Sequence, residues 1–353
     1  MLSLADKRLL FSLTFRSMIT IKDIAQQLGL SPSTVGRAIA DHPRISRETK
    51  ERVRVAAKNL GYVANTPARV VRGGSSRLVG LLVPDVRNSF FSMVAYVLSK
   101  CFENEGFHLA LSITDDDRDT EMQQVREMVS ARVAGLVIVP SAAPRRETLT
   151  LLQTVPHVQF LRRLPEIGTD WFGLDEERAL LDATNHLLHL GHRHIAYIGD
   201  VIFPTGKARY EGFRRAYSEA GCTVDERLIE LGPPTVPFGI EAIARALEKR
   251  PAPSAILTAS VPVTVGVVDH LETLKIDVPG ELSIIGFGDG SWHKWWRSGL
   301  TTLRLPVSEL ATSCGLWLLH CLRIGRATGS KEPHIAISQS LLVIRNSTAP
   351  PKS

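Results

Sequence analysis

Residues 20–40 read TIKDIAQQLGLSPSTVGRAIA, and this stretch decides the fold of the N-terminal part of the chain. Its apolar residues repeat at the i, i+3, i+4 and i+7 positions that form one face of a helix, namely Ile21, Ile24, Ala25 and Leu28. Thr20 is a suitable N-cap, and Asp23 lies where a carboxylate favours the positive end of the helix dipole. Gly29 ends this helix, and Ser31 followed by Pro32 starts a second one.

Three short helices are predicted in all. The second helix runs to about Ala40, and a third follows the Ser46 cap and ends at Gly61. The residues expected to face inward are Val35, Ile39, Val53, Ala57 and Leu60. Two short helices separated by a glycine turn and supported by a third are typical of a helix-turn-helix, although any small three-helix bundle shows the same periodicity.

The exposed start of the second helix decides between these alternatives. It offers short polar side chains and one cation, namely Ser33, Thr34 and Arg37. In a helix-turn-helix this end enters the major groove, where an arginine binds guanine through two hydrogen bonds. We therefore predict an all-α DNA-binding head over residues 18–64, rather than a bundle with a solvated face.

Positive charge is concentrated on that head. The whole chain has 353 residues and a formal net charge of +6. Residues 18–76 contain ten Lys or Arg and four Asp or Glu, a net charge of +6, whereas residues 77–353 contain 29 and 31, a net charge of −2. Such a field attracts a polyanion and makes its binding salt-dependent. The alternative is a basic tail that only aids solubility.

The longer stretch from residue 19 to residue 85 reads ITIKDIAQQLGLSPSTVGRAIADHPRISRETKERVRVAAKNLGYVANTPARVVRGGSSRLVGLLVPD. It resembles, without a gap, the head, hinge and first strand of the LacI/GalR (lactose/galactose repressor) family, and the resemblance continues weakly to about residue 346. It implies a homodimer that binds a near-palindromic double-stranded DNA operator. It also implies a hinge helix at about residues 65–72, within a linker of residues 65–76, that forms only on DNA and enters the minor groove. The alternative for this segment is a plain linker.

The resemblance implies DNA contacts at Thr20, Pro32, Ser33, Thr34, Gly36, Arg37, Tyr62, Asn65, Arg69 and Val71. Two of these positions depart from the family pattern. Gly36 stands where serine is usual, which removes a hydroxyl and weakens the helix by up to about 1 kcal/mol relative to alanine. Val71 is smaller than the leucine that wedges into a base step in the family. Because Pro32 and Gly36 have no side-chain donor, we expect Ser33 and Arg37 to carry most of the base recognition.

Strands and helices alternate over residues 77–346. The apolar runs are 78–83, 108–113, 135–139, 195–199, 255–258 and 282–287, and the amphipathic segments between them include 89–104, 119–131, 178–190, 207–220 and 239–249. This alternation predicts an α/β domain of parallel sheets covered on both faces. The resemblance implies two lobes, similar to those of periplasmic sugar-binding proteins, with an effector between them. It places the crossovers between the lobes near 174–178, 300–304 and 321–325.

The effector contacts that the resemblance implies are Phe90, Phe91, Arg162, Asp175, Thr205, Arg209, Ser260 and Asp289. Several sugar-binding groups of the family are missing. Leu161 and Gly288 stand where aspartates are usual, and Ser260-Val261 replaces Asn-Asp. The arginines remain, and tryptophans cluster at positions 292, 295 and 296. We therefore expect an effector less hydroxylated than a plain sugar and possessing an anionic group: a sugar acid, a phosphate or a carboxylate.

Other functions find less support in the sequence. No catalytic residue set emerges, so we expect neither an enzyme nor a cofactor. The histidines between residues 186 and 194 resemble a metal site, but in the family this segment finishes a helix and enters a strand, so no metal is expected. Residues 286–288 lack the capped helix with Lys-Ser/Thr of a phosphate loop. A periplasmic-type binding protein without DNA function predicts a cleavable signal, and Arg8 and Arg16 on either side of residues 9–15 argue against one.

The four cysteines form no CxxC pair, and no apolar run reaches the roughly 20 residues of a membrane span, so we expect reduced thiols in a cytoplasmic protein without membrane contact. Residues 1–17 are an extension unless translation starts at Met18. The resemblance places residues 88–103 at a dimer interface, and the tail after residue 346 lacks the leucine heptad of a tetramer. Closure of the lobes on ligand would couple effector to operator with about 1–3 kcal/mol. Repression is the commoner mode in the family, and an activator or dual regulator is the alternative.

Overall fold

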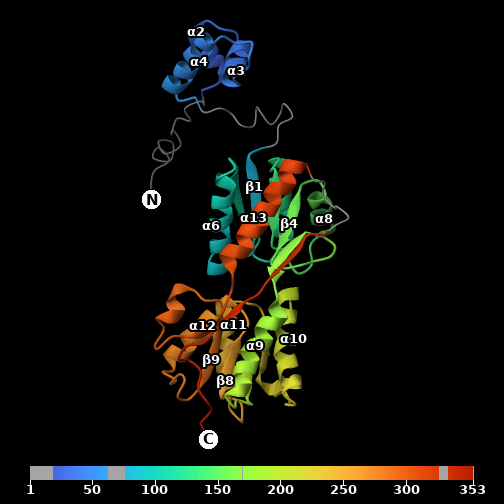
Figure 1. Cartoon of the computed structure of the whole chain (residues 1–353), viewed down its shortest axis with the longest axis vertical. Coiled ribbons are helices and arrows are strands. Elements are labelled where there is room, and N and C mark those ends of the chain that lie inside the picture. Colours follow the sequence, from blue (N-terminus) through green and yellow to red (C-terminus); the bar gives the residue numbers. More distant parts are fainter. Residues whose placement is uncertain (1–18, 63–75, 169, 326–332, 353) are drawn as a thin grey trace, which may run out of the picture. The chain divides into compact units, whose positions relative to one another are not determined.

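The computed structural model describes residues 19–62, 76–168, 170–325 and 333–352. Its contacts divide the chain into two compact units, residues 1–74 and residues 75–353 (Figure 1). Each unit has its own hydrophobic core and is described by itself. In the described ranges, every helix is too short or too polar to serve as a membrane span.

The first unit is the predicted three-helix head, with α2 (Ile21–Leu28), α3 (Pro32–Ile39) and α4 (Arg47–Leu60). Its core consists of fully buried side chains from all three helices, among them Ile24, Val35 and Val53. Gly29 and Gly61 end α2 and α4 in the left-handed conformation, as predicted. The sequence prediction was wrong at Ile39, which is 37% exposed, because Ala38 is the residue that the short helix turns towards the core.

The second unit consists of two α/β lobes (Figure 1). The elements of the first lobe are β1 (Leu78–Val83), α6 (Ser89–Glu103), β2 (His108–Ile113), α7 (Arg118–Ser130), β3 (Gly135–Ile138), α8 (Arg146–Leu152), β4 (His157–Phe160), β5 (Trp171–Leu174), α13 (Val307–Ile324) and β11 (Ile335–Ser338). The elements of the second lobe are α9 (Glu176–His189), β6 (Ile195–Gly199), α10 (Pro204–Glu219), η1 (Glu226–Leu228), β7 (Ile229–Leu231), α11 (Val236–Leu247), β8 (Ala255–Thr258), α12 (Val261–Thr273), β9 (Ser283–Phe287), η2 (Ser291–Lys294), β10 (Thr301–Arg304) and β12 (Leu341–Val343).

Each lobe has one six-stranded sheet covered by helices on both faces. The strand orders are β11-β5-β4-β3-β1-β2 and β12-β10-β9-β8-β6-β7. Among the described strands, neighbours pair in parallel except for β10 and β12, which are antiparallel. Two hydrophobic clusters per lobe fill the two sides of each sheet, which explains why the central strands are continuous apolar runs. The predicted α/β class and its parallel sheets are confirmed.

In the residues that the structure describes, the chain crosses between the lobes three times. The first crossover joins β5 to α9 at residues 174–176, as the resemblance implied. The second joins β10 to α13 at 304–307, just after the expected 300–304. The third joins β11 to β12 at 338–341, so its expected position at 321–325 was wrong. Residues 321–324 instead continue the long helix α13, which ends at Gly325 in the left-handed conformation.

The second lobe extends beyond residue 346, where the predicted effector domain stopped. Ser347 is buried, donates a hydrogen bond to the Ile284 carbonyl at 2.7 Å and accepts one from the Thr301 amide at 2.8 Å. The Ala349 carbonyl contacts the His192 ring nitrogen Nε2 at 2.8 Å. The segment after β12 is therefore part of the packed lobe rather than a free tail.

Candidate functional site

The start of α3 is built by a cluster of hydroxyl groups. Ser31 caps the helix by accepting the Thr34 amide N–H at 3.1 Å. Its Oγ also lies 2.9 Å from Ser33 Oγ and 2.8 Å from Thr34 Oγ1. Pro32 occupies the first helical position, where its missing N–H costs nothing. These contacts fix the exposed Ser33 hydroxyl on the surface that the sequence assigned to DNA.

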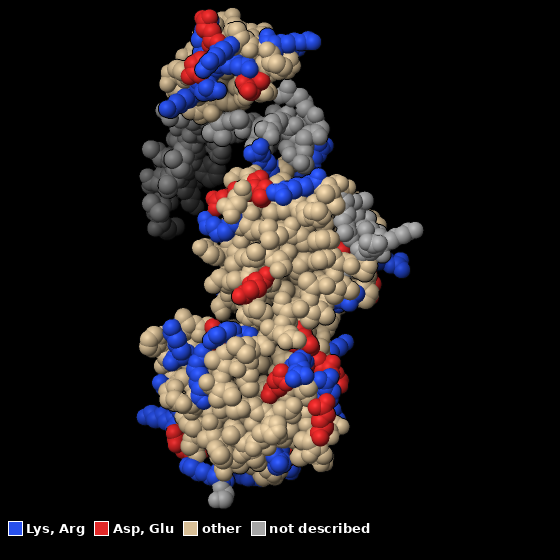
Figure 2. All heavy atoms as spheres, viewed as in Figure 1, with Lys and Arg blue, Asp and Glu red and all other residues tan. Residues whose placement is uncertain are grey.

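Arg37 follows one turn further along the same helix. Its side chain is exposed, and no described carboxylate pairs with it. Two other cations of the head are engaged, since Lys50 pairs with Asp41 at 2.8 Å and Arg54 with Glu51 at 2.8 Å. Figure 2 shows further Lys and Arg side chains on the visible face of the head. Arg37 lies in the last turn of α3 rather than at its start, where the sequence analysis placed it, because the helix ends at Ile39. An exposed guanidinium without an ion-pair partner is suited to bind a base edge or a phosphate.

The remaining assigned DNA contacts have mixed outcomes. Thr20 caps α2, where its amide and hydroxyl donate to the Asp23 carboxylate at 2.6 and 2.7 Å, and these bonds hold the pKa of Asp23 below its usual value. Gly36 has room for a side chain, because a Cβ there would lie 3.9 Å from Ile21 Cδ1. Tyr62 packs against the head core. Asn65, Arg69 and Val71 lie outside the described residues.

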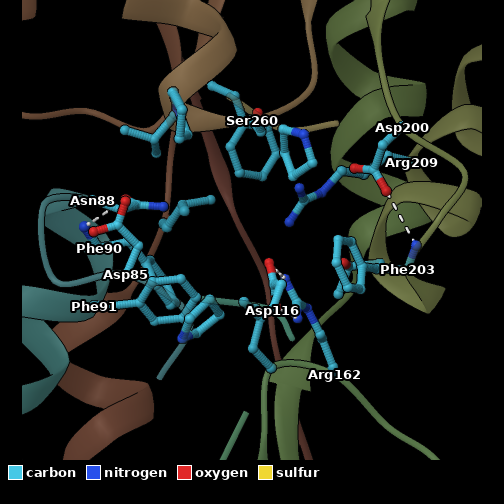
Figure 3. Close-up of a pocket in the computed structure, with 18 residues that line it drawn as sticks. Asp85, Asn88, Phe90, Phe91, Asp116, Arg162, Asp200, Phe203, Arg209 and Ser260 are labelled. Carbon is cyan, nitrogen blue, oxygen red and sulfur yellow. Dashed lines mark hydrogen bonds and ion pairs between the residues drawn. The ribbon is translucent and has the colours of Figure 1, made fainter. Parts of the chain in front are cut away.

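A pocket lies between the two lobes, at the carboxyl ends of the parallel strands (Figure 3). Its volume is about 100 Å³. Ligands of open α/β sheets bind at this edge, and it is where the sequence analysis expected the effector. Six of the eight expected contacts line the pocket: Phe90, Phe91, Arg162, Thr205, Arg209 and Ser260. Polar lining residues that the sequence analysis missed are Asp85, Asn88, Asp116 and Asp200.

Arg162 reaches the pocket from the end of β4 in the first lobe. Its guanidinium forms an ion pair with Asp116 and donates to the Pro140 carbonyl at 3.1 Å. It also lies over the ring of Phe203, a second-lobe residue, 3.5 Å from the ring centroid. Arg162 thus touches both lobes, and its remaining N–H groups are available to a ligand.

Arg209 reaches the pocket from α10 in the second lobe. Its Nε and Nη2 donate to the two Glu176 oxygens at 2.7 Å each, and its Nη1 donates to the Ala259 carbonyl at 2.8 Å. Burial by itself would lower the pKa of Arg209, but the Glu176 carboxylate outweighs it and holds the pKa above its usual value. Figure 3 shows Arg162 and Arg209 directed towards the same space.

Three further carboxylates and an amide belong to the polar lining, and one of these carboxylates, Asp85, pairs with Arg87 at 2.9 Å. Asp116 is held by consecutive residues in the left-handed region, with φ of 52° at Asp115 and 56° at Asp116. Asp200 is buried and accepts the amides of Ile202 and Phe203 at 3.1 Å each. Asn88 uses its carbonyl oxygen to cap α6, which leaves its NH2 group for the pocket. The left-handed backbone at Asp115 and Asp116 is a strained conformation of the kind that clusters at ligand sites.

Behind the pocket, Glu121 is fully buried and accepts the amide and hydroxyl of Ser141 at 2.6 and 3.0 Å. Burial raises the pKa of Glu121, while those hydrogen bonds oppose the shift. Pro140, whose carbonyl receives Arg162, precedes Ser141 in the chain. Glu121 therefore holds the segment after β3 whose Pro140 carbonyl accepts the hydrogen bond from Arg162.

Two expected effector contacts lie elsewhere. Asp175 caps α9 by accepting the Arg178 amide at 3.1 Å, because it directly precedes that helix. Asp289 forms ion pairs with Arg304 and Arg345 at 2.7 and 2.8 Å within the second lobe. The Arg304, Thr302 and Arg345 donors hold the pKa of Asp289 below its usual value against the effect of burial. Neither carboxylate lines the pocket.

The tryptophan cluster and the histidines are also outside the pocket. Trp292 and Trp296 pack on the second-lobe core, and Trp295 is 75% exposed. His192 lies between Ser254 and Ala349, and His186 contacts Thr348. Within the ranges that the structure describes, no group of three His, Cys, Asp or Glu side chains could hold a metal ion.

Known proteins match both units of the chain. A family model described as "Bacterial regulatory proteins, lacI family" matches residues 20–65, and one described as "Periplasmic binding protein-like domain" matches residues 184–348. The HTH-type transcriptional regulator GalR of Escherichia coli (strain K12) is 29% identical over 297 residues, which cover 84% of this chain and 87% of that protein. The HTH-type transcriptional repressor CytR of the same strain is 27% identical over 331 residues, 93% of this chain and 96% of that protein.

Solved structures show the same architecture. A LacI family transcriptional regulator from Silicibacter pomeroyi has 28% identity and a TM-score of 0.66, over 77% of this chain and 98% of that one. The lac repressor dimer bound to operator and the anti-inducer ONPF has 20% identity and a TM-score of 0.78, over 94% and 99% of the two chains. The second likeness is one of fold alone.

Proposed function

The chain belongs to the LacI family of bacterial regulatory proteins, and from this premise we propose that it acts as a homodimeric repressor whose operator binding is controlled by a ligand in the interlobe pocket. Its family makes it a DNA-binding transcription regulator, not an enzyme. The observation that carries the proposal is the pairing of a capped, cationic α3 surface with a polar pocket at the strand ends. Its place of action is the cytoplasm, where the chromosome lies.

The operator is a near-palindrome in this proposal, because two identical heads bind two half-sites related by two-fold symmetry. Ser33 and Arg37 supply the base contacts, and the other exposed cations of the head bind phosphates. Repression is proposed as the mode because CytR, which matches 93% of the chain, is a repressor. Activation, or both modes at different promoters, is the alternative.

A gel-shift assay tests this function with the full chain and the DNA upstream of its own gene. We expect a retarded complex at an inverted repeat, and an affinity that falls steeply as salt rises, because phosphate contacts release counterions. Scrambling one half-site should abolish the specific complex. Equal retardation of scrambled and intact DNA would contradict sequence-specific binding.

The dimer is proposed to form through the exposed side of α6 and β2. This side carries the apolar side chains Met93, Tyr96, Leu111 and Ile113, of which Tyr96 is the most exposed at 62%. Figure 2 shows few charged side chains on the visible face of the first lobe. Contiguous apolar surface of this kind marks protein interfaces.

For the effector, we propose a small molecule rich in oxygen acceptors, because Arg162, Arg209 and Asn88 all direct N–H groups into the pocket. A sugar acid or another anion is the first candidate, since two arginines converge there. A neutral sugar is the second, because Asp116 and Glu176 already balance the two arginines and Asp200 adds a negative charge. A pocket of about 100 Å³ is small for either, so the lobes must part to admit a ligand.

D-gluconate and D-glucose form a matched pair of probes for these candidates. If the anionic group is recognised, the midpoint temperature of thermal unfolding of the full chain should rise with gluconate and remain unchanged with glucose. Stabilisation by glucose alone would support the neutral candidate. Ser260→Ala, which removes one hydroxyl from the pocket, should reduce either shift.

A further inference from the structure

A second cavity lies between the lobes, separate from the effector pocket. Its volume is about 340 Å³, which is within the range of small-molecule sites. The first lobe contributes β5 and the ends of β4 and β11, and the second lobe contributes the starts of α9 and α10. Leu161 and Thr205 line both cavities and form the partition between them.

The floor of this cavity is the flat indole of Trp171. The ring occupies the space that a side chain at Gly173 would fill, since a Cβ there would lie 2.0 Å from Trp171 Cζ2. Its Nε1–H donates to the Leu161 carbonyl at 3.1 Å, and Leu161 itself has a left-handed φ of 62°. Gly173 and the Leu161 carbonyl together fix the plane of the ring. A fixed indole plane suits the stacking of a planar ligand.

Arg163 supplies the charge of the cavity. Its guanidinium lies over the Trp171 ring in a cation–π contact, 5.6 Å from the ring centroid, and its side chain is exposed. No described carboxylate pairs with it. It differs in this from the neighbouring Arg162, whose charge Asp116 balances. The cavity therefore holds an arginine whose fork of N–H donors is open to a ligand.

The acidic residues around the cavity are engaged. Glu176 binds Arg209 through both oxygens, and Glu177 forms an ion pair with Arg215. Asp175 caps α9. The other walls are apolar and consist of Leu161, Leu174, Pro204, Ala208 and Ile337. The chemistry that remains for a ligand is one aromatic plane, apolar walls and one cation.

We propose that this cavity binds a planar aromatic carboxylate, with its ring on Trp171 and its carboxylate on Arg163. The ligand touches both lobes, so its binding favours the lobe arrangement in which Trp171 and the start of α10 lie close together. The site is distinct from the effector pocket. Its occupation adds a second input to the same regulator.

Three matched probes test the proposal on the full chain: 4-bromobenzoate, 4-bromobenzyl alcohol and 4-bromobenzylamine. We expect calorimetry to rank the carboxylate first, and bromine anomalous scattering from a soaked crystal to lie over Trp171. Arg163→Gln should weaken 4-bromobenzoate by about tenfold or more and leave the alcohol unchanged. Because Arg163 is exposed, this variant should fold as the wild type does, which circular dichroism checks.

Two control variants sharpen the result. Ser260→Ala removes a hydroxyl that lines the effector pocket and caps α12, and Arg146→Gln removes another exposed arginine. Neither residue lines the second cavity, so both variants should bind 4-bromobenzoate as the wild type does. Stronger binding of the amine, no binding at millimolar concentration, or bromine in the pocket of Arg162 and Arg209 would each overturn the proposal. Without probe, Arg163→Gln should bind the operator as the wild type does. A failure of the second-cavity proposal can therefore be told apart from a failure of the proposed regulator function.

Discussion

Arg162 and Arg209 bring two guanidiniums into one pocket, and a carboxylate from another element holds each of them. Both arginines were expected in the pocket from their place in the family pattern, and the structure puts them there. Their partners Asp116 and Glu176 were not expected, because each comes from a different element that only the folded lobes bring close. Asp175 and Asp289 do not line this pocket. Asp175 caps α9 and lines the second interlobe cavity, and Asp289 pairs with Arg304 in the second lobe.

The DNA contacts allow a test at one residue. Arg37→Ala removes the exposed, unpaired guanidinium of α3. The free energy of operator binding should weaken by about 1–3 kcal/mol, roughly fivefold to 150-fold in affinity, with relaxed preference at one base pair per half-site. Fluorescence anisotropy on single-base operator variants measures both effects. Arg54→Ala, which removes an arginine paired with Glu51, is the matched control and should lower affinity slightly and uniformly. Equal effects of the two variants would argue against base recognition by Arg37.

Gly36 belongs to the scale of the helix. A Cβ at this position meets only Ile21 Cδ1 at 3.9 Å, and glycine costs a helix interior about 0.5–1 kcal/mol relative to alanine. Gly36→Ala should therefore raise the free energy of unfolding of the head by about that amount. Urea denaturation of the full chain, monitored by circular dichroism through the transition in which the head unfolds, measures this free energy. A loss of stability would mean that α3 needs the glycine for packing.

The contact between His192 and the segment after β12 should make the stability of the second lobe depend on pH. His192 is buried between Ser254 and Ala349, and burial holds its pKa below the usual value. The unfolded chain then binds a proton that the folded lobe resists, so stability is full above about pH 6.5 and is lost as the pH falls below it. The slope contributed by this histidine is at most about 1.4 kcal/mol per pH unit.

His192→Asn should flatten this loss of stability between pH 6.5 and pH 5 in urea denaturation, while the exposed His108→Asn should not. Some slope will remain, because burial also lowers the pKa of His186 and His293. If the pH slope of the free energy of unfolding is the same in His192→Asn as in the wild type, the folded lobe does not lower the pKa of His192.

The elements themselves were predictable to different degrees. The central strands β1, β6 and β9 are apolar runs, because they are buried on both faces, and the sequence identified them. The edge strand β11 alternates exposed and half-buried residues over only four positions, a pattern too short to recognise. The third crossover was misplaced because α13 continues through residues 321–324, and the chain returns to the second lobe only after β11.

At the scale of the whole molecule, the proposed dimer requires the apolar side of α6. Tyr96→Glu places a charge in the middle of that side and should turn a dimer into a monomer in sedimentation velocity at micromolar concentration. Operator affinity should fall with it, because two half-sites are no longer bound together. Val55→Glu, a like change at an exposed apolar residue of the head, should leave the dimer intact. If Tyr96→Glu is still a dimer, the dimer interface lies on another surface of the chain.

Selection from random duplexes shows whether the head binds a two-fold-symmetric DNA sequence. The full chain is incubated with a random library at moderate salt, and the retained DNA is sequenced over successive rounds. We expect enrichment of one near-palindromic site, and loss of base preference at one symmetric pair of positions with Arg37→Ala. Absence of any enriched inverted repeat, together with retention of DNA that does not change at high salt, would contradict it.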